Sequence, residues 1–82
     1  MKDNELLENL RESAYEISQS ATNAIKYGIN DSYLGRPSNK ESIEDELTNL
    51  MAIYFILSDN KIINKINKTD ISKRITKIKS LL

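Results

Sequence analysis

The chain has 82 residues with 12 basic and 12 acidic side chains, a formal net charge of zero, and no cysteine or histidine. The missing cysteines exclude disulfides and thiolate zinc sites, and the missing histidines exclude Ser-His and Cys-His nucleophile schemes. Any chemistry must therefore use carboxylates, lysines, amides and a metal ion. A single core is only marginally self-sufficient at this length, so we expect one domain over residues 1–82 that gains stability by forming an oligomer.

The charges are unevenly distributed along the chain. Residues 1–50 hold ten acidic and five basic residues, whereas residues 51–82 hold two acidic and seven basic residues. The lysines of the basic end lie between isoleucines at helical spacing, without an aromatic stacking group nearby, so we expect a solvated helix face and no direct nucleic-acid binding. No apolar run approaches the roughly 20 residues of a membrane span. The first residues also lack a signal-like apolar stretch, so we expect a cytoplasmic location and no membrane partner.

A long first helix is predicted by apolar residues that alternate by three and four. Its apolar stripe consists of Leu7, Leu10, Ala14, Ile17, Ala21 and Ala24. Asp3 or Asn4 is placed to cap its start, and Gly28 is placed to end it in a left-handed conformation. Residues 28–37 hold both glycines and the single proline of the chain, so they form the loop between two helices.

A second helix begins with a capping-box pattern, in which Glu41 follows Ser38 by three residues. Its predicted apolar stripe is Ile43, Leu47, Leu50, Tyr54 and Leu57. The segment LMAIYFIL, residues 50–57, is apolar on every side, and an 82-residue monomer cannot bury such a segment completely. We therefore expect its second face to contact another subunit.

Residues 58–61 predict a turn, and Thr69 or Asp70 is placed to cap a final helix. The stripe of that helix is Ile71, Ile75, Ile78 and Leu82. The fold class is therefore all-α: an antiparallel helical hairpin of two long helices plus a shorter C-terminal helix, assembled as an oligomer.

Carboxylates lie beside the two long stripes. At about 100° per residue, Ser13 flanks the first stripe and Glu12 and Glu16 lie on its polar side. Glu46 and Asn49 share one side of the second helix. If the stripes pack together, Ser13 and Glu16 lie opposite Glu46 and Asn49 at the margin of the interface. Mg²⁺ prefers oxygen ligands and commonly bridges protein carboxylates to phosphates, so this margin is a candidate phosphate-ligand site.

Three segments in order, LRESAYEISQSATNAIKYGIND, PSNKESIEDELTNLMAIYFIL and ISKRITKIKSLL, resemble the MazG-like all-α nucleoside triphosphate pyrophosphohydrolases, in particular small bacteriophage-type members. That family carries EExxE on one helix and ExxD on the next, and its members are typically oligomers. The resemblance implies that Glu12 and Glu16 remain from the first motif, with Ser13 replacing a Glu. It implies that Glu46 remains from the second, with Asn49 replacing the Asp. Because each motif has lost an anion, the implied Mg²⁺ site is weak or lost.

Basic, aromatic and amide side chains near the loop are candidates for binding a nucleotide. A helix N-terminus presents free N–H groups to anions, and a tyrosine ring can stack on a base. The candidate ligand-binding residues are Lys26, Tyr27, Tyr33, Arg36, Asn39, Lys40 and Asn49; the candidate metal ligands are Glu12, Glu16 and Glu46. No catalytic residue is assigned. Taken singly, Glu12 and Glu16 are better explained as a solvated helix face, and Asn39 is explained equally well as a first-turn residue beside its cap.

These features support three functions. The first is a MazG-like protein that binds a phosphorylated nucleotide or nucleotide signal without turning it over, as a phage-type protein would against a host pathway. The second is an active Mg²⁺-dependent pyrophosphohydrolase, in which Glu12 replaces the missing anion. The third is a helical interaction module that docks through residues 50–57. We place the first ahead of the second.

Overall fold

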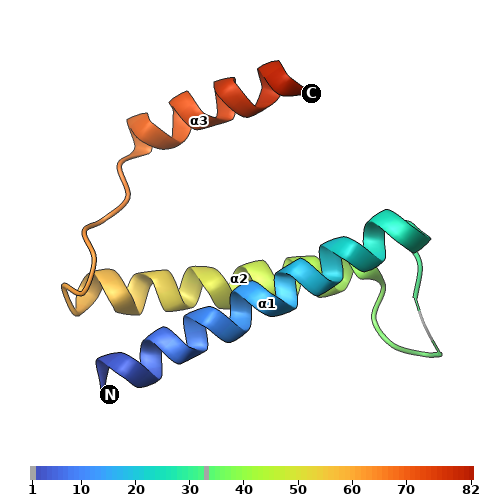
Figure 1. Ribbon diagram of the computed structural model, residues 1–82, viewed down its shortest axis with the longest axis horizontal. Helices are drawn as coiled ribbons and strands as arrows, with labels where there is room; N and C mark the ends of the chain where they lie inside the picture. Colours follow the sequence, from blue (N-terminus) through green and yellow to red (C-terminus); the bar gives the residue numbers. More distant parts are fainter. Residues whose placement is uncertain (1, 33) are drawn as a thin grey trace.

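The computed structural model describes residues 2–32 and 34–82, and these contain three α-helices and no strand. Figure 1 shows α1 (Asp3–Tyr27) and α2 (Asn39–Asp59) side by side as an antiparallel hairpin, with α3 (Lys68–Leu81) set apart from both. The predicted all-α class and its helical hairpin are therefore confirmed. None of the described helices is both long and apolar enough to cross a membrane.

The start of α1 differs from the prediction, whereas its end largely agrees. Lys2 occupies the N-cap position without a side-chain capping hydrogen bond, so the predicted cap at Asp3 or Asn4 is wrong. Both residues lie instead in the first turn, where the negative charge of Asp3 interacts favourably with the helix dipole. Gly28 follows the last residue of α1 with φ 103° and ψ 150°. This positive φ is one that glycine adopts readily, although the ψ value lies outside the left-handed helical region.

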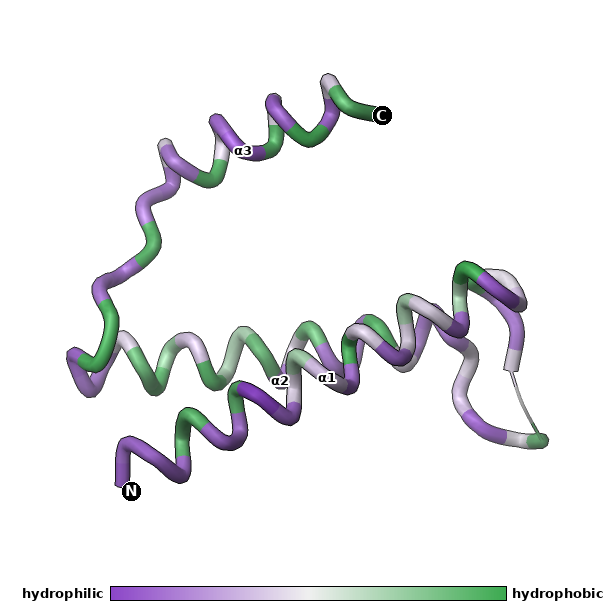
Figure 2. The backbone as a smooth tube through the Cα atoms, viewed as in Figure 1, coloured by the Kyte–Doolittle hydropathy of each residue, from purple (hydrophilic) through white to green (hydrophobic). Residues whose placement is uncertain are grey.

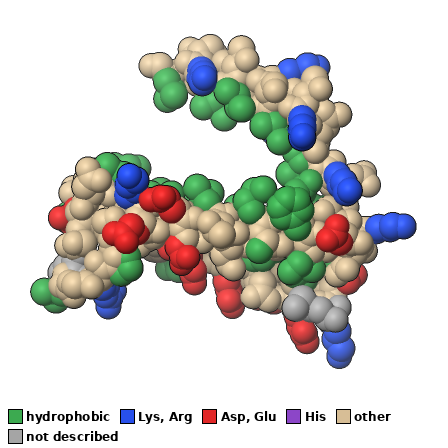
Figure 3. Space-filling model, turned by 180° about the vertical axis from the view of Figure 1, so that it is seen from behind, with side chains coloured by type: hydrophobic (Ala, Val, Ile, Leu, Met, Phe, Trp, Pro, Cys, Tyr) green, Lys and Arg blue, Asp and Glu red, His purple; other side chains and the backbone are tan. Residues whose placement is uncertain are grey.

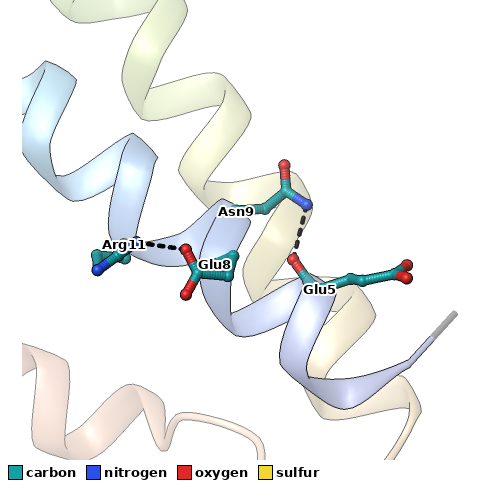
Figure 4. A network of polar contacts seen from close by, with 4 residues as sticks. All are labelled: Glu5, Glu8, Asn9 and Arg11. Atoms are coloured by element: carbon teal, nitrogen blue, oxygen red, sulfur yellow. Dashed lines mark hydrogen bonds and ion pairs between the residues drawn. The ribbon is translucent and has the colours of Figure 1, made fainter.

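The first half of α1 is stabilised by contacts within the helix itself (Figure 4). The side-chain amide of Asn9 donates to the Glu5 carbonyl oxygen at 2.9 Å, and the Arg11 guanidinium pairs with the Glu8 carboxylate. These side chains are exposed, so each contact contributes only a few tenths of a kcal/mol to helix stability. Neither contact reaches another element.

The predicted capping box of α2 is confirmed. The Glu41 N–H donates to Ser38 Oγ at 3.2 Å, and the Ser38 N–H donates to Glu41 Oε1 at 3.4 Å. At its other end the helix continues to Asp59 and is followed by Asn60, so it extends into the segment predicted as a turn. For α3 the N-cap is Asn67, whose side-chain oxygen accepts from the backbone N–H of Thr69 at 2.7 Å. The predicted cap at Thr69 or Asp70 is therefore wrong.

The hydrophobic core is small and lies where the first half of α1 meets the second half of α2. Leu6, Ile53 and Leu57 are buried there, and Leu10 and Ile62 pack against them. Further along α1 the contact face continues with two buried serines, Ser13 and Ser20, seven residues apart.

The predicted stripes are partly wrong because the contact face of α1 is rotated by one residue. Leu6, Ser13 and Ser20 are buried, whereas Leu7, Ala14 and Ala21 are exposed. On α2, Leu47 is also exposed, and Ile53 is buried although it is not part of the predicted stripe. The physical reason is that both serines find polar partners on α2, so that the serine face turns towards α2. The alanine face, which makes no polar contact, turns away.

The segment between α2 and α3 is attached to α2 by hydrogen bonds. The Ile62 N–H donates to the Leu57 carbonyl oxygen at 3.0 Å, and the Ile66 N–H donates to the Tyr54 hydroxyl oxygen at 2.7 Å. Within the described residues, α3 packs against neither α1 nor α2, and none of its residues is buried. The Cα radius of gyration is 15.2 Å. A compact domain of this length would have a value of about 12 Å, so the molecule is open.

Candidate functional site

Two hydrogen bonds between side chains join α1 to α2. The side-chain N–H of Asn49 donates to Ser13 Oγ at 2.8 Å, and the Ser20 hydroxyl donates to Glu46 Oε2 at 2.9 Å. Ser13 is 4% exposed and Ser20 is 7% exposed. We call these four residues the polar seam. Ser13 therefore lies at the centre of the helix contact, whereas the sequence prediction placed it at the margin.

The seam opens on one side into a hollow of about 300 Å³, which we call the acidic hollow. Its lining residues are Glu16, Asp45, Glu46, Thr48, Asn49 and Ala52. Glu16 and Glu46 were predicted to lie opposite each other across the two helices, and the structure brings them to this one hollow. Asn49 joins them there, since it belongs both to the seam and to the lining.

One oxygen of Glu46 lacks a partner. Its Oε2 atom accepts from Ser20, but Oε1 is buried and has no hydrogen-bond partner among the described residues. A buried acceptor without a partner costs about 1–3 kcal/mol, and more when it carries charge. A hydrogen-bond donor or a cation at Oε1 would remove this cost. Glu46 is thus the carboxylate of the site that most needs a ligand.

Glu12 is not brought to the acidic hollow. It lines a separate hollow of about 440 Å³ together with Arg11, Tyr15 and Glu16, and its side chain is exposed. The structure gives no support to the idea that Glu12 replaces a missing anion beside Glu46. In residues 2–32 and 34–82, no group of three or more acidic side chains is arranged to hold a metal ion. A cation in the acidic hollow would depend on the carboxylates that line it, those of Glu16, Asp45 and Glu46.

Another cavity lies at the loop end of the hairpin, and we call it the loop-end pocket. Its volume is about 430 Å³. The residues that line it are Ser20, Asn23, Tyr27, Asp31, Arg36, Pro37, Asn39 and Ser42. Ser20 belongs to both the pocket and the polar seam, so it connects the pocket to Glu46.

The seven predicted ligand-binding residues divide between different places. Tyr27, Arg36 and Asn39 line the loop-end pocket, whereas the exposed Lys26 and Lys40 are not part of its lining. Asn49 lines the acidic hollow. The prediction at Tyr33 lies outside the described residues.

Five lining residues of the pocket were missed from the sequence: Ser20, Asn23, Asp31, Pro37 and Ser42. A signal for Asn23 was available, because residues at spacings of three and four share a helix face with Ser20 and Tyr27. Asp31 and Ser42 carry no such signal, since their position depends on the path of the loop.

Asn39 holds the loop against the start of α2. Its side-chain N–H donates to the Gly28 carbonyl oxygen at 2.8 Å, and its backbone N–H donates to the Asp31 carbonyl oxygen at 2.9 Å. The Lys40 N–H donates to the Ile29 carbonyl oxygen at 2.8 Å. Because the third N–H of α2 is used in the capping box, the first three N–H groups all have protein acceptors. The expectation that they are free to bind an anion is wrong.

The loop-end pocket combines one guanidinium, one carboxylate, one aromatic ring and several hydroxyl and amide groups. This set suits a ligand that has an anionic part, a flat ring and hydrogen-bonding edges. Comparison with models of known protein families finds no match, and neither a curated protein nor a solved structure matches the chain. A functional interpretation therefore rests on the side chains of the polar seam and of the loop-end pocket.

Proposed function

We propose that the chain is a MazG-like nucleotide-binding protein that holds a phosphorylated nucleotide in the loop-end pocket and has lost most or all hydrolytic activity. The observation that carries the second half of this proposal is the hydrogen bond from Asn49 to Ser13 at 2.8 Å. These two neutral side chains occupy the positions at which the resembled enzymes hold carboxylates. The bond uses the Asn49 N–H and the Ser13 hydroxyl oxygen, and neither side chain supplies the negative charge that holds a cation.

The first half of the proposal is supported by the chemistry of the pocket. Its volume of about 430 Å³ lies within the range of roughly 300–1,000 Å³ that is usual for small-molecule sites. The planar guanidinium of Arg36 can bind a phosphate group through two hydrogen bonds. Tyr27 offers a ring face for stacking on a base, and Asn23 offers an amide for hydrogen bonds to the base edge. A phosphorylated nucleotide supplies matching groups for all three.

The loss of activity follows from the charge at the seam. Mg²⁺ is reluctant to lose its water ligands and is held mainly by negative charge, so a site that has lost two motif carboxylates binds it less tightly than a site that keeps them. Glu16 and Glu46 would hold a metal ion that arrives with the nucleotide, and the unpartnered Oε1 of Glu46 is one oxygen available to it. Such an ion would screen the phosphates during binding. In this proposal the chain retains the nucleotide as a sequestering protein, and a bacteriophage-type role against a host pathway is consistent with that.

An active Mg²⁺-dependent pyrophosphohydrolase is the second candidate, and one observation favours it. Glu16 and Glu46, from the two motifs, line the same hollow. An assay for pyrophosphate release from nucleoside triphosphates separates the candidates. The sequestering protein releases little pyrophosphate, whereas rapid multiple turnover by the unaltered chain would establish the enzyme.

Calorimetry tests the binding proposal directly. Nucleoside triphosphates and cyclic nucleotides are titrated into the protein with and without Mg²⁺. We expect Arg36→Ala and Tyr27→Ala each to weaken binding by about tenfold or more, equivalent to about 1.4 kcal/mol. Lys40→Ala is the matched control, because it removes an exposed cation outside the pocket. The proposal fails if no nucleotide binds, or if Lys40→Ala weakens binding as much as Arg36→Ala does.

A further inference from the structure

Helix α3 lacks the packing that a helix of its length needs. It has 14 residues, and isolated helices shorter than about 12–15 residues are only marginally stable in water. Ile71, Ile75 and Ile78 form one apolar stripe and are 44%, 47% and 58% exposed. Most helix stability in proteins comes from burying such a stripe, so α3 requires a partner surface.

The hairpin presents a matching apolar face. Leu7 on α1 and Leu47, Met51 and Phe55 on α2 are all more than 40% exposed. In an antiparallel pair, helical geometry places these residues on one side of the hairpin and Glu16 and Glu46 on the other. We call this the apolar face; it consists of Leu7, Ala14, Ala21, Leu47, Met51 and Phe55.

An open notch separates α3 from the hairpin (Figure 3). Hydrophobic side chains gather on the edge of α3 that borders the notch and on the hairpin edge opposite, and many acidic side chains lie along the far edge of the hairpin. In Figure 2, hydrophobic and hydrophilic residues alternate along the turns of α3, as expected for a helix with one apolar side. Both sides of the notch are therefore suited to burial.

The chain's own linker keeps α3 away from the apolar face. The Ile66 N–H is held by the Tyr54 hydroxyl at 2.7 Å, and Ile62 packs on the core. Tyr54 lies on α2 between the buried stripe and Met51, so the linker leaves α2 on the side of the apolar face. These contacts fix the linker on α2 as far as Ile66, and a second chain can fill the notch without altering them.

Charge favours a second copy of this chain over other partners. Residues 1–59 hold eleven acidic and five basic residues, a net charge of −6, whereas residues 60–82 hold one acidic and seven basic residues, a net charge of +6. The end of one copy is thus attracted to the hairpin of another. When each of two identical chains gives its C-terminal end to the hairpin of the other, the two contacts are related by a two-fold axis and the assembly ends at a dimer.

The exposed area agrees with a dimer. The chain has an accessible surface of 7039 Å², against about 5,000 Å² for a compact monomer of its mass. The excess of roughly 2,000 Å² per chain matches what obligate homodimers bury, about 1,000–2,500 Å² on each subunit.

We propose that two copies of this chain form a dimer in which the α3 helix of each copy packs across the apolar face of the other. The isoleucine stripe of α3 is then buried against Met51 and Phe55. The carboxylates of the acidic hollow remain on the outside of the dimer. The proposal is independent of nucleotide binding.

Sedimentation equilibrium of the full chain tests the assembly. We expect the unaltered chain to be a dimer. Ile75→Glu should raise the dimer dissociation constant by at least about 100-fold, because the dimer contains two symmetric α3 contacts and each would then bury a charge. Thr76→Glu adds the same charge beside the stripe and should leave the dissociation constant within about fivefold. Met51→Glu, on the opposite surface, should act as Ile75→Glu does. The proposal is overturned if the unaltered chain is a monomer, or if neither Ile75→Glu nor Met51→Glu weakens the dimer.

Crosslinking tests the exchange of α3. The chain has no cysteine, so a Met51→Cys, Ile78→Cys double variant carries only the two introduced thiols. A short bismaleimide linker should yield covalent dimers on a denaturing gel. Covalent monomers with an internal bridge would show that α3 closes on its own hairpin, and would overturn the proposal.

Discussion

We expect the hydrogen bond between Ser20 and Glu46 to contribute more to stability than a hydrogen bond between two neutral groups does. Ser20 Oγ donates to Glu46 Oε2 at 2.9 Å, and the other oxygen of Glu46 is buried without a partner in the described part of the chain. Ser20→Ala therefore leaves both carboxylate oxygens without a protein donor. A hydrogen bond to a charged group contributes about 1.5–3 kcal/mol, and the partial exposure of Glu46 favours the lower half of this range.

We expect Ser20→Ala to lower the free energy of unfolding by about 2 kcal/mol, which corresponds to a fall of about 10 °C in Tm for a domain of this size. Glu46→Gln should change stability by less than about 1 kcal/mol, because its amide keeps an acceptor for Ser20 and removes the buried charge. When Glu46→Gln is already present, adding Ser20→Ala should lower the free energy of unfolding by about 1 kcal/mol less than Ser20→Ala does alone, since the charged partner is absent.

The assay is urea unfolding followed by circular dichroism at 222 nm, at one fixed protein concentration. Ser18→Ala is the control, because Ser18 is an exposed serine of the same helix whose side chain makes no hydrogen bond with residues 2–32 and 34–82. Its substitution should stabilise the protein by a few tenths of a kcal/mol through helix propensity. Equal stabilities for Ser20→Ala and Ser18→Ala would refute the reasoning.

Three further predictions concern the seam, the start of α2 and the linker. Ser13→Glu with Asn49→Asp should lower Tm by about 10–20 °C without Mg²⁺, because an anion is buried at a site that is 4% exposed. Adding 10 mM Mg²⁺ should recover part of that loss and allow pyrophosphate release; an equal response of the unaltered chain to Mg²⁺ would contradict this. Ser38→Ala should cost about 1 kcal/mol in urea unfolding, whereas Ser38→Asp, which still caps the helix, should cost little. Tyr54→Phe should speed hydrogen exchange of the Ile66 amide by about tenfold, since it removes the 2.7 Å acceptor, with little change in global stability.

Local sequence rules were sufficient where a structure depends on a few neighbouring residues. The capping box at Ser38 and Glu41 requires only their spacing of three, and the structure forms both of its hydrogen bonds. Gly28 ended α1 as predicted, because few other residues tolerate its backbone conformation. Asn67 replaced the predicted cap of α3, since Asn67, Thr69 and Asp70 stand close together and their order alone does not select one. At α1 the helix begins one residue before the predicted caps, with Lys2 at the N-cap position.

The choice of packing face could not be made from the sequence. Leu6, Ser13 and Ser20 form one face of α1, and Leu7 with Ala14 forms the next. Hydrophobicity favours the second face, which contains alanine in place of serine. The structure buries the first face because the partners of its serines lie on a helix 26 and 36 residues further along the chain. Such pairing is a tertiary effect that intrinsic residue preferences do not contain.

The candidate site was predictable only in part for the same reason. Tyr27, Arg36 and Asn39 were selected because residue types that bind phosphates and bases are concentrated near a loop, and the structure brings the three to one pocket. Asp31 was missed because it enters the pocket through the fold of the loop. The use of the α2 N–H groups by loop carbonyls also depends on that fold, and so the predicted anion site was wrong.

The three hydrogen bonds that hold residues 28–31 to the start of α2 affect how quickly a ligand can be bound. A wall that is already ordered loses little conformational entropy when a ligand arrives, so association needs no slow rearrangement. Encounter frequency then sets the rate.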